Sequence, residues 1–170
     1  MKFKELFTAS MLIFGAGAIR EQGIKLDFFL LHALTSIHAI HSLIPILTPQ
    51  ELVELLRGHI IATLAWYVSR GRPSLQVDLL LNYEISESTK SAANPWLDIF
   101  QRAILAPEAH IIKVIRACSV GQILFGQDCQ LLDQAWLKLA DMTLTISGGK
   151  CDGGRYWNYN GVGFADAWKE

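Results

Sequence analysis

The stretch that decides the fold is LLHALTSIHAIHSL, residues 30–43, an apolar run that carries three of the five histidines in the chain. With its flanks the run covers residues 26–47, which is long enough to cross a bilayer. Asp27, the three histidines and Pro45 lie inside it, however, and polar groups are costly in lipid. We therefore expect a buried helix over residues 25–46 of a soluble protein, with a membrane-associated helical protein as the weaker alternative.

A second long helix is predicted by the next segment, LTPQELVELLRGHIIATLAWYVSRG, residues 47–71. Thr48 is a favoured N-cap residue, Pro49 takes the first helical position, and Glu51 completes a capping box. Apolar residues recur at helical spacing along the segment. The glycine and proline that follow predict its end.

Most of the remaining chain also has helical patterns. Further helices are predicted over residues 3–15, over residues 94–105 with Asn94 as the cap, over residues 107–125 and over residues 130–146. Residues 74–83 fit either a strand or a helix, and residues 84–94 indicate a polar loop. The glycine-rich, aromatic residues 147–168 predict an ordered tail that docks through Trp157, Phe164 and Trp168. We expect one all-α domain over residues 1–170: a multi-helix bundle with this C-terminal tail packed on it.

Composition excludes several classes of protein. Hydrophobic residues make up 51% and charged residues 18% of the chain, which argues against disorder. A net charge of −1 with scattered basic residues offers no field for nucleic acid. Three cysteines without C-x-x-C spacing fit a reduced, cytoplasmic protein. A signal peptide over residues 1–20 stays open as an alternative, although Glu5 interrupts its basic region.

Two glycine-containing segments imitate nucleotide-binding motifs. LIFGAGAIR, residues 12–20, has Arg20 where a dinucleotide-binding turn requires its third glycine, and helical patterns follow it. SGGKCDGG, residues 147–154, lacks the spacing of a phosphate-binding loop. No motif therefore indicates NADPH, whose use stays open.

The histidines of the first stretch do not form a site by themselves. On a regular helix His38 and His41 stand about 60° apart, and His32 points about 120° away from His38. One helix therefore cannot aim all three at one metal ion. We expect His38, His41 and His59 to be core or interface residues that hydrogen-bond to the backbone.

A second stretch, PEAHIIKVIRAC, residues 107–118, places His110 and Lys113 on one helix face. The surrounding isoleucines and valine indicate that much of this helix is buried. A buried lysine tends to lose its proton, and the neutral amine can react with carbon dioxide to give a metal-binding carbamate. The alternative, which spacing alone favours, is a lysine that reaches solvent along its stem.

Four blocks resemble the questin oxidase-like family of fungi and bacteria in order and spacing. They are DFFLLHALTS, YVSRGRPSL, EAHIIKVIRA and YWNYNGVGFADAW, at residues 27–36, 67–75, 108–117 and 156–168. The resemblance implies an all-helical enzyme for the oxidative ring opening of anthraquinone-type polyketides. The reaction is described as Baeyer–Villiger-like oxygenation or oxidative carbon–carbon cleavage. Part of the family is expected to use a non-haem metal, iron, held by histidines and a carboxylated lysine.

Carried over residue by residue, the resemblance implies that His32, His110 and Lys113 are metal ligands. His110 and Lys113 would also be the catalytic residues, with Lys113 carboxylated. Such a donor set suits iron(II) with open positions for oxygen and substrate. Thr35 and Ser36 are candidates for orienting the ligands.

The chain also departs from the family pattern. Family members are much longer, and this chain resembles only their C-terminal part. The third block usually begins with an acidic pair before its histidine, whereas residues 106–110 here read APEAH. The leading hypothesis is an oxidoreductase, complete or partial, that acts on a small aromatic polyketide. The rival is a non-catalytic helical interaction module or degenerate fragment, which binds a partner chain or the missing N-terminal half.

Overall fold

Helices build almost the whole molecule, which confirms the all-α prediction. The computed structural model describes residues 2–128, 130–148 and 156–169. The α-helices are α1 (Lys2–Gly15), α2 (Leu30–Leu43), α3 (Pro49–Ser69), α4 (Val77–Leu81), α5 (Glu87–Ser91), α6 (Pro95–Ile104), α7 (Ala109–Phe125) and α8 (Gln130–Gly148). Short 3₁₀ turns are η1 (Ile44–Ile46), η2 (Gly126–Asp128) and η3 (Ala165–Trp168). Two-residue strands β1 (Ile19–Arg20) and β2 (Gly23–Ile24) pair antiparallel, with Ile19 opposite Ile24.

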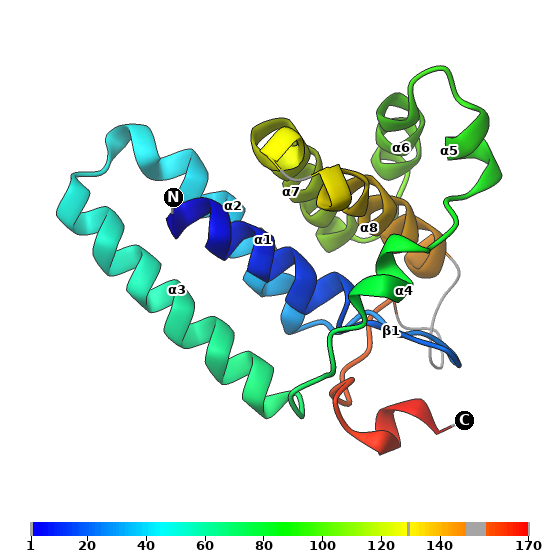
Figure 1. Cartoon of the computed structure of the whole chain (residues 1–170), viewed down its shortest axis with the longest axis horizontal. Helices are drawn as coiled ribbons and strands as arrows, with labels where there is room; N and C mark the ends of the chain where they lie inside the picture. The colour runs from blue at the N-terminus through cyan, green and yellow to red at the C-terminus, as the bar shows by residue number, and fades with distance from the viewer. Residues whose placement is uncertain (1, 129, 149–155, 170) are drawn as a thin grey trace.

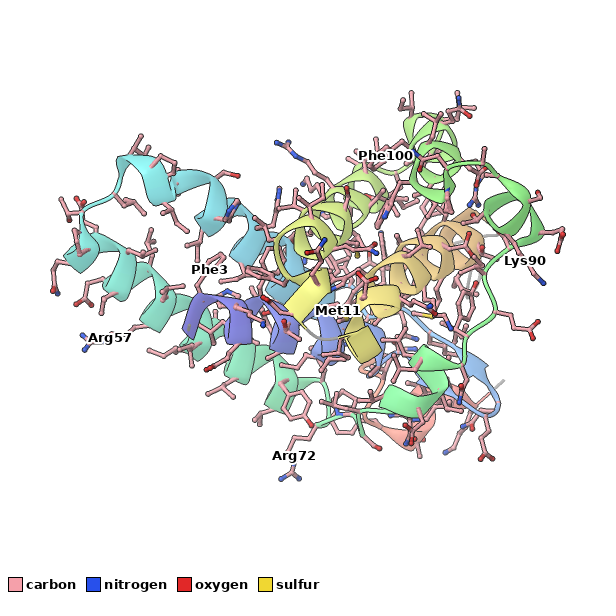
Figure 2. The ribbon with its side chains drawn as sticks, turned by 45° about the horizontal axis from the view of Figure 1, so that its top comes forward. Phe3, Met11, Arg57, Arg72, Lys90 and Phe100 are labelled. Carbon is pink, nitrogen blue, oxygen red and sulfur yellow. The ribbon has the colours of Figure 1, made fainter. Side chains whose placement is uncertain are left out.

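The core lies where α1, α2, α7 and α8 meet. Helix α2 packs against α1, α3 and α7, so the expected buried helix is confirmed. In Figure 1, α3 lies on one side of this centre and α5 and α6 lie on the other. Met11 is fully buried at the centre, whereas Arg57 of α3 and Phe100 of α6 lie toward opposite edges (Figure 2). Among the described helices, one stretch, Ala109–Asp128, is long and apolar enough to cross a membrane by length and composition.

Two helices begin later than predicted, and at each start an acidic side chain accepts hydrogen bonds from backbone N–H groups. Helix α2 begins at Leu30 rather than near residue 25, and Asp27 Oδ1 accepts from the backbone N–H groups of Phe29 (2.9 Å) and Leu30 (3.2 Å). Helix α7 begins at Ala109 rather than residue 107, with Glu108 as the N-cap. A carboxylate at these positions satisfies N–H groups that have no partner within the helix.

The predicted capping box of α3 is confirmed. The hydroxyl of Thr48 accepts from the backbone of Glu51, whose side chain accepts from the backbone of Thr48. The ambiguous residues 74–83 contain helix α4. Asn94 caps α6 as predicted, by accepting from two backbone N–H groups of its first turn.

The polar segment predicted as a loop contains helix α5, and a buried carboxylate explains the difference. Asp141 of α8 is fully buried and accepts from Ser86 Oγ (2.6 Å), Thr89 Oγ1 (2.6 Å) and Arg102 Nη2 (2.8 Å). Thr89 Oγ1 also lies 2.9 Å from Asp98 Oδ2 of α6, and its single hydrogen can go to only one of the two carboxylates at a time. We call these five residues the Asp141 network; it ties α5 and α6 to α8. Local sequence alone could not predict α5, because its partner lies 52 to 55 residues away.

Helices α7 and α8 approach closely at Gly121. A Cβ atom at this position would lie 2.4 Å from the ring of Trp136, which is itself buried. Any side chain here would therefore push the two helices apart. Glycine at position 121 allows the tryptophan of α8 to cover the backbone of α7 directly.

The tail packs on the bundle, as predicted, beside the start of α2 and the end of α3. Trp157 is 2% exposed and Trp168 is partly buried, but Phe164 is 49% exposed and does not dock fully. Asn158 pairs with Asp27 in a parallel bridge. Gly71 has a φ of 84° and lies against Gly163, so this turn requires a residue without a side chain. The expected docking of residues 149–155 lies outside the described residues.

The segment that imitates a dinucleotide-binding turn, residues 12–20, runs from the last turn of α1 into strand β1 of the β1–β2 hairpin. Arg20 donates to the carbonyl oxygen of Ser74 (3.0 Å), and its guanidinium lies 5.2 Å from the ring centre of Trp168. The arginine therefore connects the hairpin to the tail rather than to a nucleotide.

Candidate functional site

All four blocks of the sequence meet at one place, where α2 and α7 begin, α3 ends and the tail crosses. We call it the histidine junction, and its members are Asp27, Phe28, His32, Trp66, Arg70, Glu108, His110, Trp157, Asn158, Tyr159 and Val162. Asp27 is its buried centre. Its Oδ2 accepts from Arg70 Nε at 3.0 Å and from the backbone N–H of Val162 at 3.4 Å. Arg70 also donates to the carbonyl oxygen of Tyr159. One carboxylate therefore holds α2, α3 and the tail together.

His32 lies in the first turn of α2 and is held by the backbone before that helix. Its Nδ1 lies 2.8 Å from the carbonyl oxygen of Phe28. A carbonyl oxygen only accepts hydrogen bonds, so Nδ1 carries the proton. In the neutral imidazole, Nε2 is then the unprotonated nitrogen, which is the one able to bind a metal or accept a proton.

His110 lies in the first turn of α7 and is held by a carboxylate. Its Nδ1 lies 2.6 Å from Glu108 Oε1, and its backbone N–H donates to Glu108 Oε2 at 3.0 Å. Trp157 Nε1 donates to the same Oε2 at 2.8 Å. Burial alone would raise the pKa of Glu108, but the hydrogen bonds from His110 and Trp157 outweigh burial and lower it. The carboxylate is therefore ionised, and His110 donates to it through Nδ1.

The two imidazoles are brought together by this arrangement. The ring centres of His32 and His110 lie 5.4 Å apart, although the residues are 78 positions apart in sequence. Within the part of the chain that the structure describes, Nε2 of neither ring has a hydrogen-bond partner. Engagement of Nδ1 by a carbonyl or carboxylate is the usual arrangement of a metal-binding histidine. The same arrangement also suits a general base.

Lys113 follows His110 by one turn of α7 and is exposed. The burial expected for its helix face therefore does not extend to this residue. Across residues 2–128, 130–148 and 156–169, no cluster of three or more His, Cys, Asp or Glu side chains could hold a metal ion. The predicted roles of His32, His110 and Lys113 as metal ligands, and of His110 and Lys113 in catalysis, stay predictions.

Ser36, which the sequence suggested as a residue that orients the ligands, contacts His59 instead. Its hydroxyl meets His59 Nδ1 at 3.0 Å, whereas the groups that hold His32 and His110 are Phe28 and Glu108. For Thr35, the described residues show no hydrogen bond to either imidazole.

His59 is a core residue, as expected, but its partners are side chains rather than the backbone. It is 6% exposed, and Ser36 and Ser10 meet its two ring nitrogens, the latter at 3.2 Å from Nε2. Burial lowers its pKa. His38 packs against Phe7, and burial lowers its pKa, as do the charges of Arg116 and His41.

Aromatic rings surround the histidine pair. The ring centre of Phe28 lies 5.0 Å from His32, 5.1 Å from His110 and 4.9 Å from Tyr159. Trp66 of α3 lies 6.0 Å from His32. Tyr159 is partly open to solvent. These rings offer flat apolar surfaces beside two imidazole nitrogens.

Sequence reasoning missed Asp27, Glu108 and Trp157 as members of the site. Asp27 was noted only as a polar residue in an apolar run, and Glu108 only as part of a departure from the family pattern. A usable signal was present at Glu108, because an acidic residue just before a helix often caps it. No local pattern could have predicted that Trp157 reaches that carboxylate from 49 residues away.

Comparison with known proteins identifies the class of this fold and site. Residues 1–118 match the family described as questin oxidase-like. The chain is 30% identical over 152 residues to the questin oxidase of Aspergillus terreus, covering 83% of this chain and 33% of that protein. It is 31% identical over 155 residues to the oxidoreductase AflY of Aspergillus parasiticus, covering 84% of this chain and 30% of that protein. A Baeyer–Villiger oxidase, ptaJ of Pestalotiopsis fici, is 25% identical over 169 residues, covering 91% of this chain and 37% of that protein.

The chain therefore belongs to the questin oxidase-like family, as the four blocks predicted. It spans about a third of the length of the curated relatives it matches. Those relatives are fungal and are named oxidases or an oxidoreductase.

Proposed function

We propose that this chain carries part of the active site of an oxidoreductase of fungal secondary metabolism, which opens a ring of an anthraquinone-type polyketide with oxygen in the cytoplasm. The observation that carries the proposal is the approach of His32 and His110, each held through Nδ1, with no hydrogen bond to Nε2 from any described residue. The names of the relatives support the reaction class. The rings of Phe28, Trp66 and Tyr159 would stack on a planar aromatic substrate.

The two imidazoles fit a non-haem metal, because each presents an unprotonated Nε2 on a fixed ring. When bound, iron would supply the chemistry of oxygen activation. His32 and His110 would hold the metal through Nε2. Glu108 and the Phe28 carbonyl would keep the imidazoles in the tautomer that binds.

Lys113 enters the proposal as the source of an anionic oxygen ligand. Its neutral amine would form a nitrogen–carbon bond to carbon dioxide and release one proton, which leaves a carbamate. Exposure of Lys113 gives carbon dioxide access to the amine.

Insertion of one oxygen atom from dioxygen leaves the second atom to be reduced to water. This reduction takes two electrons, and we include NADPH in the proposal as their source. The reductant is otherwise unassigned by the sequence.

A second candidate, a helical module that binds a partner chain, rests on exposed apolar side chains of α3, namely Val53, Leu55, Ile60, Ile61, Leu64 and Val68. All of these except Leu55 fall within about 100° of the helix circumference. An exposed apolar stripe of this kind is typical of an interaction surface. In relatives three times as long, further polypeptide would cover it, so this role and the oxidase role are compatible in a complete enzyme.

Iron binding tests the proposal. Purified chain should bind iron(II) without oxygen present, and binding should strengthen when bicarbonate is added. His32→Ala and His110→Ala should each weaken binding by more than about 10–100-fold, and Lys113→Ala should abolish the response to bicarbonate. His41→Ala is the matched control, because it removes an imidazole outside the junction. If neither His32→Ala nor His110→Ala changes the affinity for iron, the proposed metal site is wrong. The interaction module would then be the remaining candidate function.

A further inference from the structure

Glu108 receives three donors on one carboxylate. They are the imidazole Nδ1–H and the backbone N–H of His110, and the indole N–H of Trp157. A carboxylate can accept all three, because it has two oxygens and no hydrogen of its own when ionised. A glutamine could not, since its amide group would turn a donor toward one of them.

The carboxylate thus joins two segments that lie apart in sequence. Oε1 is committed to the imidazole, and Oε2 is shared by the start of α7 and the tail tryptophan. Trp157 is buried and its ring cannot turn freely, so its N–H fixes where Oε2 lies. With Oε2 fixed, the position of Oε1 and the plane of the imidazole follow.

We infer that Glu108 and Trp157 are positioning residues: the docked tail, acting through the Glu108 carboxylate, holds His110 with Nδ1 protonated and Nε2 directed away from it. His32 does not depend on this link, because a backbone carbonyl holds it. The inference rests on the proposed role of His110 in the reaction. It is tested on the metal-free protein, so its failure is distinguishable from failure to bind iron.

The experiment is long-range proton–nitrogen NMR of the histidine rings, in protein labelled with ¹⁵N histidine. The pH is set well above the ordinary histidine pKa of about 6.5, so that the rings are neutral. Wild type should show His110 and His32 each as a single tautomer with Nδ1 protonated. In Glu108→Ala, His110 should lose that pattern and shift toward the Nε2-protonated form, while His32 keeps its pattern.

Trp157→Phe tests the tail separately, because it retains the α7 cap and most of the ring packing. It should give His110 a mixed tautomer pattern and leave His32 unchanged. Trp96→Phe is the matched control: Trp96 also donates through its indole nitrogen, to Gln122 at 2.9 Å, but on α6. The His110 pattern should be unaffected by that change.

Two results would overturn the inference. A His110 ring that keeps its single Nδ1-protonated pattern in Glu108→Ala removes the role of the carboxylate. The same pattern retained in Trp157→Phe, or an equal loss in Trp96→Phe, removes the link to the tail. If Glu108→Ala fails to fold, Trp157→Phe still decides between these outcomes.

Discussion

The histidine junction and the Asp141 network are built from the same parts but end differently. Each has a buried aspartate that accepts from an arginine and from neighbouring donors. In the Asp141 network the described side chains hydrogen-bond to one another. In the histidine junction, His32 and His110 are each held at Nδ1, and no described residue hydrogen-bonds to Nε2. The first arrangement satisfies its polar groups internally, whereas the second leaves two ring nitrogens available.

The largest effect is expected when the tail is removed from the histidine junction. Ending the chain after residue 155 removes Trp157 and Val162, both buried, from the junction. Loss of one buried tryptophan alone costs about 3–5 kcal/mol, so the free energy of unfolding should fall by at least that amount. Urea unfolding followed by circular dichroism measures it. Unchanged stability would mean that the tail is not part of the junction, and Phe164→Ala, at a half-exposed site, serves as the control.

The second prediction concerns the removal of the central carboxylate from the Asp141 network. Asp141→Ala leaves Arg102 without its buried partner, and breaking a buried ion pair typically costs 3–5 kcal/mol. We expect a loss near the lower end, about 3 kcal/mol, because the Arg102 side chain is 31% exposed and water can reach it. The NMR pattern of His32 and His110 should stay that of wild type. A changed histidine pattern would show that the two regions are coupled rather than separate.

The Asp141 carboxylate should also make the free energy of unfolding depend on pH in acid. Burial alone would raise the pKa of Asp141, but hydrogen bonds from Ser86, Thr89 and Arg102 outweigh it and lower the pKa. Below the ordinary aspartate pKa of about 3.9 the unfolded state then binds more protons than the folded state, so stability falls as the pH falls. Above that pH this contribution is fully present. In Asp141→Asn the free energy of unfolding should therefore depend less on pH below about pH 4, as measured by urea unfolding at several pH values. An equally steep acid dependence in that variant would assign the effect to other carboxyl groups.

The smallest effect is expected at His59, the closed counterpart of the histidine pair. In His59→Leu, Ser10 and Ser36 keep hydrogen bonds to the carbonyl oxygens of Leu6 and Ala33. The free energy of unfolding should fall by about 1 kcal/mol, because among the described side chains that meet His59 the buried Thr63, whose hydroxyl lies 3.5 Å from Nε2, loses its partner. Thermal unfolding checks this, and His59→Asn is the polar comparison. A loss several times larger would show that His59 holds α1, α2 and α3 together.

Local signals predicted the helices and not the site. Thr48 with Glu51, and Asn94 with Pro95, defined helix starts because a cap is a contact within one turn. Helix α5 was missed because Asp141, far along the chain, fixes Ser86 and Thr89. Tertiary hydrogen bonds of this kind leave no periodicity in the sequence.

The prediction that His32 and His110 share a site came from the resemblance to a family. Helical geometry alone could only show that the histidines of one helix point in different directions. The groups that hold the pair were not predicted. A backbone carbonyl such as that of Phe28 exists at every residue, so nothing in the sequence distinguishes it. Glu108 acts through a side chain that meets Trp157, and such a pairing becomes evident only in three dimensions.

The place of the tail in the junction also sets when the junction can form during synthesis. The ribosome makes Trp157 and Val162 after Asp27, Arg70 and Glu108, and segments that emerge earlier begin to fold first. A nascent chain therefore carries both histidines well before the groups that complete their surroundings. The surroundings of the imidazole pair are therefore complete only after the tail has been made and has docked.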